Sequence, residues 1–222
     1  MEYLRVYKLP NYSKIRLGKI YDGGYVIYDI PNVNYDLCIC GGIGDDMSFE
    51  EAFVNKYPGI ECIAFDGTID SLPESNNKIT FIKKNLGNIN TDYICNLQEY
   101  FSKYNNIFMK IDIEGGEIPL FHSMSDDDLK KIRQIVIEFH NAYEQDIPTK
   151  ISKTHWLVHF HGNNCCGVNS NGVPNIFECT YVLKTDNEIV EFNDEPIPNL
   201  IDYPNDPNKS DISLIGYPYI TK

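Results

Sequence analysis

Short apolar runs alternate with segments of helical spacing through the middle of the chain, and this alternation constrains the fold most. The apolar runs cover residues 37–40, 60–65, 79–82, 107–111 and 135–139. The segments between them with the periodicity of amphipathic helices are 48–57, 96–104 and 125–134. Parallel strands need crossover connections, and these are right-handed. The repetition of strand, helix and strand therefore predicts an α/β fold with a mostly parallel sheet.

Two of the predicted helices carry start signals. Ser48 is expected to cap the first, with Glu50 and Glu51 in its first turn, where the helix dipole favours negative charge. Ser125, followed by three aspartates, is expected to begin another.

Length and composition fit one domain. The chain has 222 residues, 42% of them hydrophobic, which is ample for a buried core. We expect neither a secretory signal nor a membrane span, because no apolar stretch approaches the roughly 20 residues of a transmembrane helix. Nineteen basic against 32 acidic residues give a formal charge of −13. Such a charge repels phosphates and anionic lipids, so nucleic acid and membrane are not expected as partners.

The cysteines predict a reducing compartment. There are seven, and Cys38, Cys40 and Cys62 lie inside apolar runs, where cysteine behaves as a small hydrophobic residue. We interpret them as reduced thiols of a cytoplasmic protein. Cys165 and Cys166 lie in a polar segment and are interpreted as ordinary loop residues, with a redox-active or metal-binding pair as the alternative.

The two ends of the chain differ from its middle. Residues 15–30 predict a strand pair that turns at 22–24. We expect a single domain over residues 1–185, with its first 34 residues, which include this strand pair, at one flank. Residues 186–222 are rich in Asp, Asn and Pro. We expect this extension to pack on the domain or to contact another subunit of a homo-oligomer, with partial flexibility as the alternative.

The first two apolar runs end in residues suited to a nucleoside. Gly42 and Gly44 permit a tight turn before a helix N-terminus, but Met47 stands where a dinucleotide-binding turn has its third glycine. Asp66 follows Gly42 by 24 positions, near the spacing at which an acid accepts hydrogen bonds from ribose hydroxyls. An aspartate that caps a short turn is the alternative. Together these features favour an adenosine cofactor without a pyrophosphate, such as S-adenosylmethionine.

Polar pairs with a spacing of two residues follow three later runs. They are Asp112 with Glu114, Glu138 with His140, and His159 with His161. Residues two apart in a strand point to the same face, so the pairs are expected to converge on one crevice at the sheet edge. The polar loop 162–175 and Trp156 are expected to select the acceptor, because loops at this edge carry specificity.

Several stretches of the chain resemble FkbM-type S-adenosylmethionine-dependent methyltransferases, in the branch called the methyltransferase-21 family. The matching stretches include RLGKIYDGGYV, CGGIGDDMSFEEAF, AFDGTI, KIDIEGGEIPLF and IEFH, between Arg16 and Val182. The resemblance implies a Rossmann-like class I methyltransferase fold. Its sheet would have seven mostly parallel strands with helices on both faces, and its last strand would be antiparallel.

The resemblance also implies cofactor-binding residues. Gly42 and Gly44 would line the methionine part of S-adenosylmethionine, and Asp66, followed by Gly67, would bind the ribose. Asp112 and Glu114 would face the cationic sulfonium and amino groups. Cys40 replaces the acid that many methyltransferases place two residues before the turn, so that acid's contact would come from Asp45, Asp22 or Asp112.

For the activity, the resemblance implies an O-methyltransferase acting on a sugar or glycan hydroxyl. We expect His140 to be the base, because neutral histidine accepts protons near pH 7, with Glu138 orienting or replacing it and His161 next in order. Metal independence is favoured, although Asp112, Glu138 and His140 could hold a divalent ion. Two alternatives stay open: a metal hydrolase or oxygenase using Glu138, His140, His159 and His161, and a catalytically silent binding module.

Overall fold

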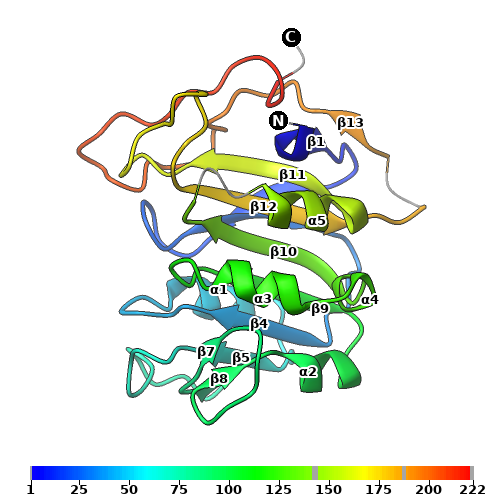
Figure 1. Ribbon diagram of the computed structural model, residues 1–222, viewed down its shortest axis with the longest axis vertical. Coiled ribbons are helices and arrows are strands. Elements are labelled where there is room, and N and C mark those ends of the chain that lie inside the picture. Colours follow the sequence, from blue (N-terminus) through cyan, green and yellow to red (C-terminus); the bar gives the residue numbers. More distant parts are fainter. Residues whose placement is uncertain (1, 142–144, 187–188, 221–222) are drawn as a thin grey trace.

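A seven-stranded sheet organises the protein in the computed structural model, which describes residues 2–141, 145–186 and 189–220 (Figure 1). From one edge to the other, the strands are β11 (His155–Gly162), β12 (Phe177–Leu183), β10 (Ile132–Phe139), β9 (Ile107–Ile111), β4 (Leu37–Gly41), β5 (Cys62–Phe65) and β6 (Ile79–Ile82). Five neighbouring strands, β10 to β6, are parallel, whereas β12 is antiparallel to both β10 and β11. The predicted α/β class, the seven strands and the antiparallel last strand are confirmed.

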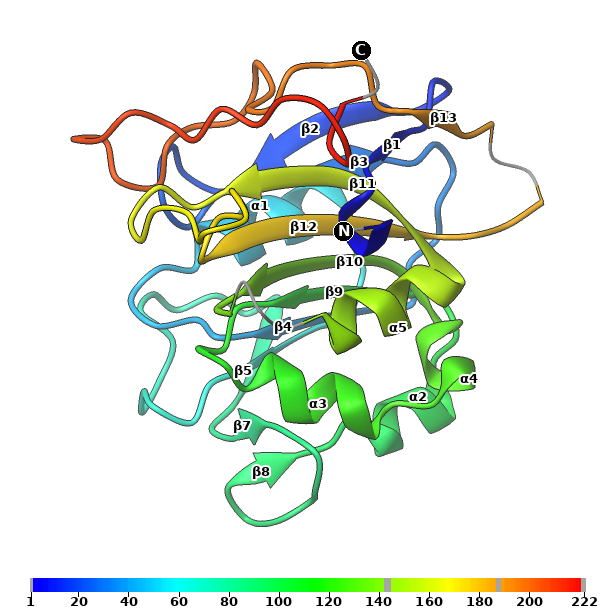
Figure 2. The same cartoon turned by 45° about the horizontal axis from the view of Figure 1, so that its top comes forward.

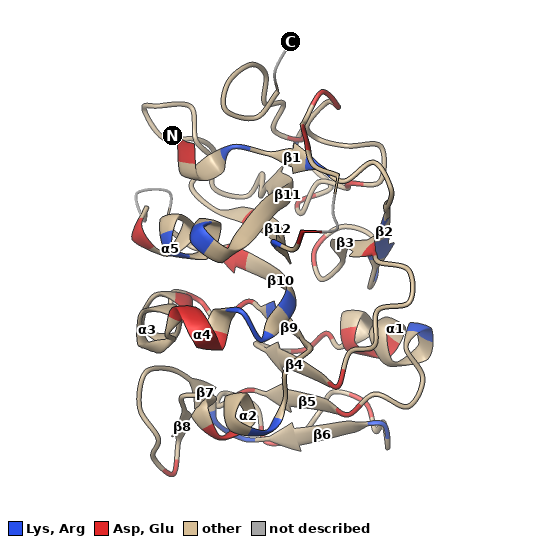
Figure 3. Cartoon of the chain, turned by 90° about the vertical axis from the view of Figure 1, so that its right-hand side faces the viewer, with Lys and Arg blue, Asp and Glu red and all other residues tan. Residues whose placement is uncertain are grey.

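Helices cover both faces of this sheet, as predicted (Figure 3). On one face, α1 (Ser48–Lys56) packs beside the hairpin of β2 (Ser13–Leu17) and β3 (Tyr25–Asp29), which confirms the predicted strand pair. The opposite face is covered by α2 (Gln98–Lys103), α3 (Glu117–Ser123), α4 (Asp126–Leu129) and α5 (Asp146–Thr154), with the short 3-10 helix η1 (Glu2–Leu4) beside them. No helix in the described part of the chain is long and apolar enough to cross a bilayer.

Two predictions about helix boundaries are wrong. The helix expected over 125–134 is only α4, since Ile132 is buried and already pairs with Ile107 as the first residue of β10. Its start is as predicted, because Ser125 forms a capping box with Asp128. Ser48 is not the cap of α1; the carboxylate of Asp46 accepts the Ser48 N–H at 3.1 Å instead.

The described residues after Thr185 lie against the domain (Figure 2). β13 (Glu191–Phe192) pairs with β1 (Tyr7–Lys8), and another two-stranded sheet joins β7 (Asn85–Leu86) to β8 (Ile94–Cys95). Ile197, Leu214 and Tyr219 are buried in the same core as α3 and α5. The C-terminal segment therefore contributes to the hydrophobic core of the domain.

Candidate functional site

A cavity of about 330 Å³ lies at the carboxyl ends of β4, β5 and β9. This is the edge at which open α/β sheets bind ligands. Acidic side chains dominate its polar lining, with two lysines among them: Asp22, Asp45, Asp46, Glu50, Asp66, Asp112, Glu114, Lys19 and Lys110. The structure thus brings most of the predicted cofactor-binding residues to one cavity, including Gly42 and Gly44. Gly67 does not line it.

The turn after β4 allows no side chain at Gly42. Its φ is +77°, and a Cβ atom there would lie 1.5 Å from the carbonyl oxygen of Asp112. The backbone of β4 can therefore meet that of β9 at this point only through a glycine. Gly44 has a φ of +56°, but a Cβ there would meet no atom within 4 Å and would face open space.

Asp66 holds this turn in place. One carboxylate oxygen accepts the N–H groups of Ile43 and Gly44, each at 2.9 Å, and the other accepts the N–H and hydroxyl of Thr68. Burial acts to raise the pKa of Asp66, but these hydrogen bonds outweigh it and lower the pKa to about 2. A carboxylate offers about four lone-pair positions, and all four are used here. The role of Asp66 in binding ribose stays a prediction: a ribose hydroxyl would have to share or displace one of these bonds.

Two charged residues that sequence reasoning did not assign to the site lie within the cavity wall. Glu50 is 1% exposed, and neither of its carboxylate oxygens has a hydrogen-bond partner among the described residues. Lys110, 5% exposed, donates to the carbonyl of Gly42 at 2.8 Å, and its Nζ lies 3.9 Å from Glu50 Oε1. Burial raises the pKa of Glu50 to about 8, although Lys110 opposes this shift. The sequence did contain one indication of this pair: Lys110 lies within an apolar run, and a charge buried there needs a buried partner.

A second group of polar side chains adjoins the cavity at Asp112. His140 Nε2 lies 3.6 Å from Asp112 Oδ1, 3.8 Å from Glu138 Oε2 and 3.4 Å from Glu114 Oε2. On the other side of the ring, Nδ1 contacts Oε1 of the buried Glu117 at 3.2 Å. Two of the three predicted pairs therefore converge, as expected, and Glu117 is an addition that no sequence pattern indicated.

Charge on these neighbours keeps His140 protonated. Burial alone would lower its pKa, but the hydrogen bond to Glu117 and the charges of Glu138 and Asp112 outweigh burial and raise the pKa to about 9. The neutral imidazole that a general base requires is therefore the minor form at pH 7.

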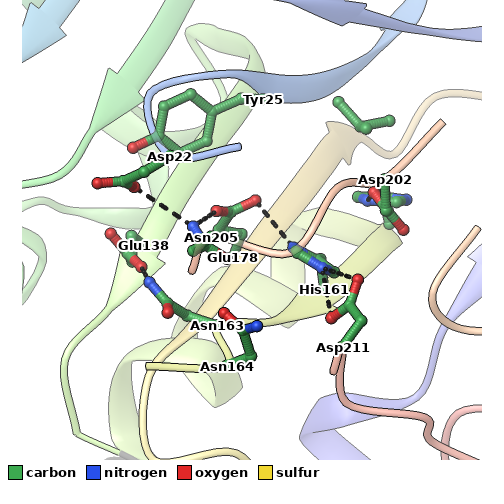
Figure 4. Close-up of polar contacts among 12 residues, drawn as sticks. Asp22, Tyr25, Glu138, His161, Asn163, Asn164, Glu178, Asp202, Asn205 and Asp211 are labelled. Atoms are coloured by element: carbon green, nitrogen blue, oxygen red, sulfur yellow. Dashed lines mark hydrogen bonds and ion pairs between the residues drawn. The ribbon is translucent and has the colours of Figure 1, made fainter. Parts of the chain in front are cut away.

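The third pair, His159 and His161, contacts a different set of carboxylates. His159 Nε2 lies 3.0 Å from Asp202, and His161 contacts Glu178 through Nδ1 and Asp211 through Nε2 (Figure 4). Burial acts to lower the pKa of His161, but these two carboxylates raise it to about 10. The C-terminal segment supplies a carboxylate to each ring, and the convergence of this pair with the other two stays a prediction.

Of the residues predicted to select the acceptor, Asn163 reaches the site and Trp156 does not. Trp156 packs on Tyr7, with ring centroids 4.7 Å apart. It lies near the beginning of β11, whereas the cavity lies at the carboxyl ends of the parallel strands. Its predicted role is not compatible with this position. Asn163, in the polar loop, does reach the site and donates to Glu138 Oε1 at 2.7 Å. Asn205 of the C-terminal segment links Asp22 to Glu178 (Figure 4).

Comparisons with known proteins do not assign a family. No family model matches the chain, and no curated protein matches it. Among solved structures, the chain is similar to a crystal structure of Thermoplasma acidophilum 1320, with 13% identity, a TM-score of 0.36, and coverage of 70% of this chain and 78% of that one. It is also similar to a "putative methyltransferase" from Thermoplasma acidophilum, with 9% identity, a TM-score of 0.34, and coverage of 69% and 70%. At these TM-scores the likenesses say nothing of the activity of this chain.

Proposed function

We propose that the protein is an S-adenosylmethionine-dependent methyltransferase of the FkbM type. The observation that carries this proposal is the acidic cavity formed by the glycine turn after β4, in a sheet whose last strand, β12, is antiparallel. Both the sheet and the place of the turn are those that the sequence resemblance implies. The cavity volume of about 330 Å³ lies at the lower end of the range for small-molecule sites.

The charges that line the cavity fit this cofactor. S-adenosylmethionine carries a sulfonium, an ammonium and one carboxylate, so an acidic wall with a few lysines complements it. The carboxyl of Glu50, which has no hydrogen-bond partner among the described residues, would accept a hydrogen bond from the ammonium, and Lys110 would bind the carboxylate. Asp112 and Glu114 would lie toward the sulfonium. The cofactor supplies the activated methyl group, and the protein supplies alignment.

We place the acceptor hydroxyl beside Asp112, Glu138 and His140, which adjoin the cavity at Asp112. A hydroxyl must lose its proton as the new carbon–oxygen bond forms. Neutral His140 or the Glu138 carboxylate would accept it, while Tyr25, which donates to Asp112 Oδ2 at 2.6 Å, fixes the orientation of that carboxylate. His161 is not proposed as the base, because both of its nitrogens are engaged.

The metal hydrolase or oxygenase alternative is less well supported. It requires His159 and His161 to join Glu138 and His140, but these two rings are bound to Asp202 and Asp211. Nothing in the described residues specifically favours a silent binding module.

For the acceptor we propose a sugar or glycan hydroxyl in the cytoplasm. Asparagine amides such as that of Asn163 suit neutral hydroxyls, and the charge of −13 does not repel them. The test is transfer of labelled methyl from S-adenosylmethionine to a panel of mono- and oligosaccharides, with protein and nucleic acid as comparison acceptors. We expect label in carbohydrate that resists mild base, as a methyl ether does. Label confined to protein or nucleic acid would refute the sugar assignment.

A further inference from the structure

The side chains of Asp112, Glu138 and His140 approach one another closely enough to share an ion. One ligand atom from each lies within 4.8 Å of the other two. We propose that these three residues form a binding site for one divalent transition-metal ion, at the edge of the cavity. Metal binding at this site does not depend on the proposed methyl transfer.

Each of the three side chains is oriented by a second residue through its other polar atom. Tyr25 donates to Asp112 Oδ2, Asn163 donates to Glu138 Oε1, and Glu117 contacts His140 Nδ1. The remaining atoms, Asp112 Oδ1, Glu138 Oε2 and His140 Nε2, face one another. Outer contacts of this kind, above all a carboxylate on the far nitrogen of a histidine, fix ligand orientation in metal sites.

The distances from His140 Nε2 to the two carboxylate oxygens also fit neighbouring metal ligands better than hydrogen-bonded pairs. Asp112 Oδ1 and Glu138 Oε2 lie 3.6 and 3.8 Å from Nε2, beyond the usual hydrogen-bond range. Donor atoms about 2.1 Å from a tetrahedral ion lie about 3.4 Å from each other, close to the two distances measured from Nε2. Glu114 Oε2, 3.4 Å from Nε2, lies close enough to become a fourth ligand.

Charge favours a cation at the same place. Three carboxylates, Asp112, Glu114 and Glu138, face one imidazole nitrogen, and Glu117 lies behind it. A divalent ion would neutralise part of this excess. One imidazole with carboxylate oxygens suits Zn²⁺ or Mn²⁺ better than a soft ion, which prefers thiolates.

In the proposed reaction the ion would bind the acceptor hydroxyl and lower its pKa, so that the hydroxyl loses its proton to solvent water. With the ion bound, His140 and Glu138 are ligands and do not act as the base. This role, unlike the site, rests on the proposed function.

The test is a calorimetric titration of the full chain, after removal of metals by a chelator, with Zn²⁺ and separately with Mn²⁺. We expect one ion per chain for at least one of the two metals. Glu138→Gln and His140→Gln should each weaken binding at least tenfold. His122→Gln, which removes an exposed histidine on α3, is the matched control and should bind like wild type. Absence of binding by both ions, or wild-type binding in both site variants, would overturn the proposal.

A spectroscopic measurement on wild type covers the case in which the site variants do not fold. Mn²⁺ bound to the chain should show nitrogen coupling from one histidine in electron spin-echo modulation. Bound Mn²⁺ without nitrogen coupling would exclude His140 as a ligand and overturn the site as proposed. Binding of S-adenosylhomocysteine by the same metal-free protein reports on the cofactor cavity alone, so failure of the metal site and failure of the proposed function can be distinguished.

Discussion

Gly42→Ala is expected to lower the midpoint of thermal unfolding by about 10 °C, because a side chain at this position has no room. The added Cβ would lie 1.5 Å from the carbonyl oxygen of Asp112, so the ends of β4 and β9 must separate. The N–H of Gly42 bonds to Phe65 on β5, and separation would strain that bond as well. Overpacking costs about 1–3 kcal/mol and a positive φ about 1–2 kcal/mol, which together give the expected change.

Gly44→Ala is the matched control for this variant. It lies in the same turn with a similar positive φ, but its Cβ would meet open space. We expect a cost of about 1 kcal/mol, or roughly 3 °C, from the backbone strain alone. Thermal denaturation of both variants in one buffer measures the difference. Equal losses of stability would show that the contact between the turn and Asp112 does not constrain residue 42.

Glu50→Gln is expected to stabilise the protein at pH 8 and to change little near pH 4.5. The carboxyl is buried without a hydrogen-bond partner among the described residues, and burial raises its pKa to about 8 from an ordinary value of 4.5. Between these two pH values the folded protein keeps a proton that the unfolded chain releases. Stability associated with Glu50 is thus fully present below pH 4.5 and is lost as the pH rises toward 8.

The size of this loss is on the order of 4 kcal/mol at pH 8, since each pKa unit corresponds to about 1.4 kcal/mol. Glutamine has nearly the same shape and no proton to lose, so the stability gap between variant and wild type should widen steadily from pH 5 to pH 8. Denaturant unfolding at several pH values measures it. Glu51→Gln, one residue along α1 and less buried, is the matched control, and the gap for Glu50→Gln is compared with it at each pH. A gap that is constant with pH, or that narrows toward pH 8, would contradict the assignment of a buried neutral carboxyl.

The sheet could be predicted from the sequence because its strands are buried on both faces. Such strands appear as continuous apolar runs, and all five runs became strands of the sheet, from 37–40 to 135–139. The ends of elements were less certain. Ile132 fits the end of a helix as well as the start of a strand, and only its pairing with Ile107 decides between them.

The sequence predicted the site residues whose positions follow from their spacing along one strand. It missed those whose positions depend on contacts between distant parts of the chain. Asp112, Glu138 and His140 meet because β9 and β10 are parallel neighbours, which the alternating pattern implied. Asp202 and Asp211 approach His159 and His161 from a segment more than 40 residues away, and no local pattern indicates that contact. Glu50 was expected to interact favourably with the dipole of α1, but its side chain turns toward Lys110 in the cavity wall.

Calorimetric titration of the protein with S-adenosylhomocysteine tests the central claim most directly, because the product needs neither an acceptor nor turnover. The cavity beside Gly42, Glu50 and Asp112 predicts one molecule bound per chain. S-adenosylmethionine should compete for this site, whereas NAD should not bind, since Met47 stands where a pyrophosphate-binding turn has its third glycine. No heat of binding at high protein concentration, with the chain shown to be folded, would contradict the proposal that this cavity holds S-adenosylmethionine.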